Sequence, residues 1–255
     1  MSILAANLTA WNALNVPQND TGTAGGGQDT LSPLSGWQAD PLGNNLQMGT
    51  NDALDTTQSV TVKSRNSING ELRTQTAVLT GTTFVNLSTL STTERILSVS
   101  VSAVTDSDLQ VQKASTPFTN YVTITSATTG ALRWSRVFPN AASDASVTLV
   151  RYDKTFWKNA DALTAISPTY RLTADPAAII FQGIHTSKND SATIANRLTA
   201  PAGITFVDDN VDQVGPDLAT GDVMGVWWQQ TATAGAGPIT SANSQFTSQL
   251  TVQSI

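Results

Sequence analysis

Apolar and polar residues alternate in short runs along most of this chain of 255 residues. The clearest run extends from Leu97 to Ala103, where Leu, Val, Val and Ala alternate with serines. Because successive side chains of a strand point to opposite faces, this run predicts a strand with one buried face. Similar runs, separated by Gly, Pro, Asn and Asp, recur from residue 59 onward, and helical patterns are weak. The pattern therefore predicts an all-β fold of antiparallel sheets.

The spacing of these runs predicts two β domains in series. About seven short strands between residues 59 and 151 are typical of an antiparallel sandwich of the Ig-like or jelly-roll-like kind. A second set of candidate strands follows residue 152, and turns rich in Pro and Gly separate them. We therefore expect one β-sandwich domain over 59–151 and a second over 152–255. One larger β domain is the alternative.

Residues 1–58 differ from the rest and predict an extended N-terminal arm. Four apolar residues near the start recur at a 4-3-3 spacing that is compatible with a short amphipathic helix; they are Leu4, Leu8, Trp11 and Leu14. A stretch rich in Gly, Gly22–Gly27, follows and is expected to lack regular structure. Up to Asp55 the apolar residues stand singly, as Trp37 does. Such an arm could lie over a neighbouring molecule or cover the chain's own domain, and the pattern favours neither.

Two adjacent tryptophans, Trp227 and Trp228, lie in a predicted strand. Their side chains must point to opposite faces, so both cannot enter one sandwich core. One is expected in the core, and the other faces solvent or a partner unless a loop or the N-terminal arm covers it. The candidate interface residues are therefore Leu4, Leu8, Trp11, Leu14, Trp37 and Trp228.

The composition argues against catalysis. The chain has no Cys, its only His is His185, and charged residues make up 13% of it, about half the ~25% that is usual. Nucleophilic catalysis needs a base beside an activated Ser, Cys or Thr, and the chain lacks a Gly-x-Ser-x-Gly motif. His185 follows an apolar run and is expected to mark the end of a strand. We predict no catalytic residue, and thus no enzyme.

The chain offers one cluster of oxygen ligands, Asp208–Asp212. Its alternating positions match the start of an EF-hand loop, but Gln213 replaces the required Gly and Ala219 replaces the final Glu. A solvated acidic loop is the favoured interpretation, and an irregular Ca²⁺ site is the alternative. Gly22–Gly27 does not match a phosphate-binding loop. Neither a metal site nor a cofactor is therefore predicted.

Charge and hydropathy limit the partners. The net charge is −6 and the basic residues are scattered, whereas nucleic-acid binding needs clustered basic charge. No apolar stretch approaches the ~20 residues that span a bilayer. The first residues also lack the basic and apolar regions of a signal peptide. We expect a protein made in the cytoplasm that binds neither nucleic acid nor membranes.

Four segments of the second half of the chain form a recognisable set, namely Phe156–Ala160, Ala195–Phe206, Leu218–Trp228 and Ala232–Gly237. Together they resemble the C-terminal part of virion structural proteins of tailed bacteriophages. Their motifs of strands and turns are structural rather than catalytic. The resemblance implies a non-enzymatic building block that is present in many copies in a virion, after synthesis in the host cytoplasm. Its partners would be copies of itself and other virion proteins.

We therefore expect a tail-associated structural subunit that forms a homo-oligomer through its arm and its strand edges. A capsid decoration (cement) protein is an alternative of the same class. A carbohydrate-binding module or adhesin is an alternative of another class, in which Trp227 or Trp228 would stack on a sugar.

Overall fold

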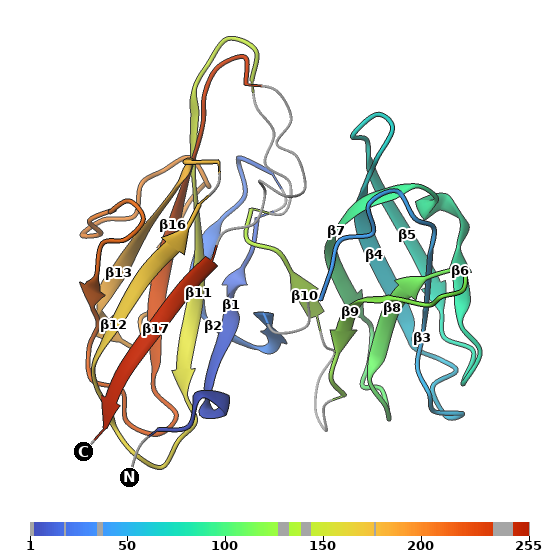
Figure 1. Ribbon diagram of the computed structural model, residues 1–255, viewed down its shortest axis with the longest axis horizontal. Coiled ribbons are helices and arrows are strands. Elements are labelled where there is room, and N and C mark those ends of the chain that lie inside the picture. Colours follow the sequence, from blue (N-terminus) through green and yellow to red (C-terminus); the bar gives the residue numbers. More distant parts are fainter. Residues whose placement is uncertain are drawn as a thin grey trace. The chain divides into compact units, whose positions relative to one another are not determined.

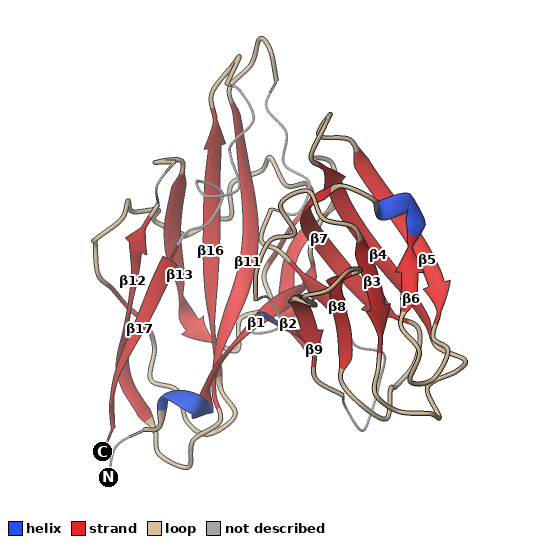
Figure 2. Cartoon of the chain, turned by 45° about the vertical axis from the view of Figure 1, so that its right-hand side comes forward, coloured by secondary structure: helices blue, strands red, loops and turns tan. Residues whose placement is uncertain are grey.

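The computed structural model describes residues 3–17, 19–34, 38–126, 133–138, 144–175, 177–236 and 247–254. This part of the chain is all-β, as the alternating pattern predicts, and its strands form antiparallel sheets (Figures 1 and 2). Helical structure within it is restricted to short 3₁₀ turns such as η1 (Ala5–Asn7) and η3 (Ser88–Leu90). None of these turns is long and apolar enough to cross a membrane.

The chain divides into two compact units. Unit 1 combines Met1–Thr30 with Val137–Ile255, and unit 2 is Leu31–Arg136. The expected boundaries at residues 58 and 151 differ from these. The N-terminal residues belong to unit 1 because they pair with strands more than a hundred residues away in the sequence.

Unit 1 contains two sheets. The six-stranded sheet has the order β13-β16-β11-β1-β2-β14. Its strands are β13 (Ile180–Lys188), β16 (Val223–Ala232), β11 (Leu149–Asn159), β1 (Leu8–Asn15), β2 (Ala24–Pro33) and β14 (Thr193–Ile194). The three-stranded sheet has the order β15-β12-β17, with β15 (Gln213–Val214), β12 (Ala165–Ala174) and β17 (Thr247–Ser254).

The N-terminal segment forms the interior of the six-stranded sheet. Strand β1 pairs antiparallel with β11, from Leu8 opposite Asn159 to Asn12 opposite Thr155, and β2 lies on its other side. The helix expected over Leu4–Leu14 is therefore wrong from residue 8 onward. A helix this short is marginal on its own, and pairing on both sides satisfies the backbone groups of β1 instead.

The Gly-rich stretch is also regular, since Ala24–Pro33 forms β2. Gly25 has a φ of +87°, and a Cβ at this position would lie 2.7 Å from a ring carbon of Trp227 and from the carbonyl oxygen of Ala192. Glycine thus allows the backbone to pass over the indole in a conformation that other residues rarely adopt. The prediction that this segment lacks regular structure is therefore wrong, because the Gly content alone does not show that the backbone must pass close to Trp227.

Both faces of the six-stranded sheet are covered. Trp228 is 3% exposed and packs edge-on against Tyr170 of β12, with 6.0 Å between ring centroids. Trp227 is fully buried on the opposite face, in a cluster with Ala24 and Ile194. The tryptophans therefore point to opposite faces, as predicted, and the chain itself covers both.

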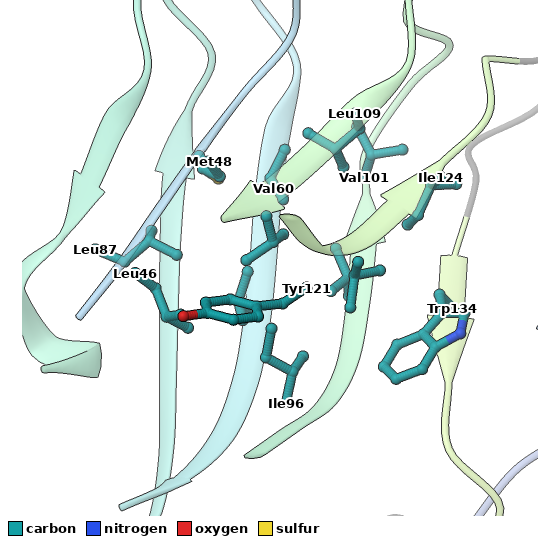
Figure 3. Close-up of a cluster of buried hydrophobic side chains, with 14 of the residues drawn as sticks. Leu46, Met48, Val60, Leu87, Ile96, Val101, Leu109, Tyr121, Ile124 and Trp134 are labelled. Carbon is teal, nitrogen blue, oxygen red and sulfur yellow. The ribbon is translucent and has the colours of Figure 1, made fainter. Parts of the chain in front are cut away.

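Unit 2 consists of two four-stranded sheets, ordered β10-β7-β4-β5 and β6-β3-β8-β9. The first contains β10 (Arg133–Ser135), β7 (Thr93–Val101), β4 (Ser59–Asn66) and β5 (Leu72–Val78), and the second contains β6 (Val85–Leu87), β3 (Leu46–Gly49), β8 (Leu109–Lys113) and β9 (Asn120–Ile124). Both sheets contribute to one apolar core, in which Val60 and Val101 lie with Met48 and Leu109 (Figure 3).

The alternating pattern predicts this unit well. The serine-rich run around Leu97 is strand β7, whose Val99 and Val101 are buried. The dipeptide Asn69-Gly70, which is typical of a hairpin turn, joins β4 and β5. The dipeptide Thr129-Gly130, a second turn signal that predicts a hairpin, lies outside the described residues.

The position of β1 predicts that a proline in it destabilises the free subunit. Ala10→Pro removes an N–H from a strand that is paired on both sides, and we expect a loss of about 3 kcal/mol or more in the free energy of unfolding. Ala10→Thr keeps the N–H and suits a strand, so it serves as the control. Urea unfolding monitored by circular dichroism measures both. Equal stability of the two variants would mean that residues 8–15 form a detachable arm.

Candidate functional site

The candidate interface residues do not form one surface in the described part of the chain. Leu4 and Leu14 are 62% and 55% exposed, whereas Leu8 and Trp11 are half-buried on β1. Trp228 is buried, and its Nε1 donates a hydrogen bond of 2.8 Å to Thr155 Oγ1.

Trp37 lies outside the described residues. Among the expected residues that the structure describes, Leu4 and Leu14 alone therefore present a largely exposed apolar side chain.

The acidic loop engages a neighbouring strand. Asp212 forms an ion pair with Arg171 of β12, and the hydrogen bond from Arg171 lowers the pKa of Asp212. Asp208 accepts a hydrogen bond from the backbone N–H of Asp209. Among the described residues, no three His, Asp or Glu side chains converge as metal ligands would. The arrangement therefore gives no support to the EF-hand-like alternative.

A shallow depression of about 280 Å³ lies on the three-stranded sheet beside this ion pair. Its lining consists of polar side chains, namely Thr169, Arg171, Asp212, Gln249 and Thr251. No aromatic ring lines it, and both Trp227 and Trp228 are buried. The carbohydrate-binding alternative requires a sugar to stack on one of these tryptophans, and neither ring is accessible to a sugar.

The most unusual group of side chains lies on β11, where charged residues are buried in a strand at the centre of the sheet. Arg151, Asp153 and Lys154 are each at most 3% exposed. Each has a partner of opposite charge from a distant segment; the partners are Asp20, Arg197 and Asp190, respectively. The sequence alone does not identify this group. The signal for it is that three charged residues stand among the apolar residues of segment 149–157.

Asp153 and Arg197 form a fully enclosed pair. Arg197 Nη2 donates to Asp153 Oδ2 over 2.8 Å, and the side chains are 0% and 4% exposed, respectively. The backbone N–H of Phe138 donates to the same oxygen, and the guanidinium lies 5.1 Å from the centre of the Phe138 ring. Burial raises the pKa of Asp153, and the charge of Arg197 opposes this shift. The pair ties the loop after β14 to the middle of β11.

Lys154 lies on the other face, between aromatic rings. Its ammonium is 4.8 Å from the centre of the Phe156 ring and 5.3 Å from that of Trp227. It donates to Asp190 Oδ2, and the Nε2 atom of His185 lies 3.6 Å from Asp190 Oδ1. Burial lowers the pKa of Lys154, and the hydrogen bond to Asp190 opposes this shift.

These buried pairs hold loops against the sheet. Asp190 and Arg197 belong to the segment between β13 and β15, which covers the Trp227 face. The chain's only imidazole, His185, accepts a hydrogen bond from the backbone N–H of Ser187 at its Nδ1 atom and faces Asp190 with its Nε2 atom. The cluster thus organises the interior of unit 1 rather than an open cleft.

The enclosure of the Asp153–Arg197 pair predicts a large cost when one partner is removed. Arg197→Met leaves the carboxylate of Asp153 buried without its counter-charge. We therefore expect the free energy of unfolding to fall by about 3–5 kcal/mol. Arg171→Met removes an ion pair whose side chains are 40% and 48% exposed, so we expect the free energy of unfolding to fall by only about 0–1 kcal/mol.

Urea unfolding of both variants at neutral pH provides the comparison. The double variant Asp153→Leu with Arg197→Met should recover part of the stability, since no uncompensated charge remains. Similar losses from Arg171→Met and Arg197→Met would contradict the assigned burial.

Comparisons of the chain with protein-family models, with curated proteins and with solved structures gave no match. The function proposed below therefore rests on the residues and contacts of this chain.

Proposed function

We propose that this chain is a non-enzymatic structural subunit of a virion, associated with the tail, which forms a homo-oligomer by pairing strand edges. The observation that carries this proposal is the edge strand β17. It pairs with β12 on one side, with Leu250 opposite Tyr170. Within the described residues, no strand pairs with its other side.

The sequence of β17 lacks two of the features that protect edge strands from pairing, although its pairing with β12 has two register shifts. Thr247–Ser254 contains no charged residue and no Pro. Natural sheets use charges, especially Lys, together with Pro and bulges to prevent association at their edges. An uncharged edge of eight residues offers backbone donors and acceptors to a strand from another molecule.

Strand β17 is also held firmly in place. The Tyr170 hydroxyl donates a hydrogen bond of 2.6 Å to Ser248 Oγ, and burial raises the pKa of Tyr170 to about 12, so the hydroxyl keeps its proton. Leu250 and Val252 pack against the buried apolar cluster of unit 1. An edge that is already ordered loses little conformational entropy when a partner strand is added.

Other features support a structural role. We infer that each unit is a β-sandwich, because apolar cores lie between sheets in both units. The buried charged residues of β11 form ion pairs inside the unit. The segments around Trp227 resemble phage virion proteins. Leu4 and Leu14 add exposed apolar area for contact with other copies. A decoration protein would share these features but would bind preformed capsid shells.

The edge hypothesis predicts that charges on β17 disrupt assembly without unfolding the subunit. Gln249 and Thr251 have exposed side chains. A lysine at Gln249 would lie opposite Arg171, at a cost of at most about 1 kcal/mol in the free energy of unfolding, so the fold should tolerate Gln249→Lys with Thr251→Lys. Copies that meet along β17 would then bring like charges together. We expect the variant to be monomeric at concentrations where the unchanged chain is oligomeric, as measured by light scattering during size-exclusion chromatography.

A control variant, Ala202→Lys with Thr220→Lys, adds the same charge to exposed turns of the same unit. It should assemble as the unchanged chain does. A monomeric unchanged chain, or an oligomer that tolerates lysines on β17, would contradict the proposal. Electron microscopy then distinguishes rings or stacks, expected of a tail subunit, from binding only to preformed shells.

A further inference from the structure

A buried lysine and a buried aspartate meet a half-buried histidine on the Trp227 face of the six-stranded sheet, and the proposed function does not use them. Lys154 comes from β11 and His185 from β13, whereas Asp190 follows β13 in a loop. The Lys154 side chain is 0% exposed and that of Asp190 is 7% exposed. Three backbone carbonyls also surround Lys154 Nζ: those of Gly26 at 3.1 Å, Asp190 at 3.3 Å and Ala192 at 3.4 Å.

A glycine in β16 provides the space for this pair. A Cβ at Gly225 would lie 2.9 Å from Lys154 Cε and 3.4 Å from Asp190 Oδ2. Gly225 has no positive φ, so the requirement at this position is for space rather than for an unusual backbone conformation. The sheet is thus shaped to bring the lysine and the carboxylate together beneath the loop.

We propose that Lys154 and Asp190 form an intramolecular isopeptide bond between Nζ of the lysine and Cγ of the aspartate. The reaction joins an ammonium and a carboxylate, with loss of one water. One proton passes from Nζ to Oδ2, and the neutral amine then attacks Cγ. The Nζ–Cγ bond forms, a second proton passes from Nζ to Oδ2, and the Cγ–Oδ2 bond breaks as water leaves. The amide nitrogen keeps the third proton, so no external reagent is required.

Burial favours the neutral amine that the attack requires, since it lowers the pKa of Lys154. The two aromatic rings and the Asp190 carboxylate favour the ammonium and oppose this shift. The amine is held against the carboxyl group, which replaces an encounter in solution by a fixed approach.

Negative charge develops on Asp190 Oδ1 during the attack. The backbone N–H of Ala192 donates to this atom over 2.8 Å, and His185 Nε2 faces it at 3.6 Å. Donors placed where charge develops stabilise the transition state.

The bond would connect the centre of β11 to the loop that covers it. Residues 154–190 would become a closed loop, which limits the unfolded chain and resists separation of β11 from β13. A subunit that carries mechanical load would benefit, but the inference does not require a virion, because it rests on the contacts of Lys154 alone.

Mass spectrometry of the full-length chain, unfolded after purification, tests the proposal. We expect a mass lower than that of the sequence by one water. Trypsin should fail to cut after Lys154, and digestion should yield a branched peptide that joins Lys154 to Asp190. A full-mass chain that trypsin cuts after Lys154, even after long incubation of the folded protein, would overturn the proposal. A missing water that maps to a succinimide at Asp190 would do the same.

Two variants and an internal control sharpen the result. Asp190→Asn can form the same amide with loss of ammonia, so its linked product should have the same mass as the linked unchanged chain. Lys154→Arg should keep the full mass of its sequence. Lys188 and Asp222 form an ion pair of 2.7 Å in which the lysine is 49% exposed, and their peptides should stay separate. A branched peptide at this exposed pair would show that proximity alone suffices and would overturn the role of the enclosed site.

Discussion

The burial of the middle of β11 is the constraint on which unit 1 depends. The strand pairs with β16 from Leu149 to Lys158 and with β1 from Thr155 to Asn159. The charged side chains of Arg151, Asp153 and Lys154 are enclosed there, so each must meet an opposite charge inside the protein. The segments that supply these charges, 19–20 and 190–197, are therefore bound to the centre of the sheet although they lie far away in the sequence.

This constraint explains what the sequence could and could not predict. In unit 2, neighbouring strands are close in the sequence, and alternation around Leu97 together with Asn69-Gly70 identifies β7 and the β4–β5 hairpin. In unit 1 the pairing is remote. Residues 8–12 pair with residues 155–159, and a pattern within a few neighbouring residues cannot predict so distant a partner. The spacing of Leu4, Leu8, Trp11 and Leu14 therefore favoured a helix where long-range pairing produces a strand.

The candidate residues show the same limit. Alternation correctly predicts that Trp227 and Trp228 point to opposite faces, but it cannot show that the loop around Ile194 covers one of them. The interface role expected for Trp228 depended on that missing information. Conversely, Lys154 looks like any charged residue in the sequence. Its significance emerges only when Gly225, Asp190 and the aromatic rings surround it.

The placement of charge connects the two proposals. A chain with only 13% charged residues uses several of them inside unit 1 and leaves none on β17. Removing charge from an edge lowers the repulsion between approaching copies. Pairing charge inside a sheet, by contrast, stabilises nothing unless the partners are fixed precisely enough to offset desolvation. A covalent bond between Lys154 and Asp190 would remove that cost, because it converts two buried charges into one neutral amide. The subunit would then keep its shape while its uncharged edge engages another copy.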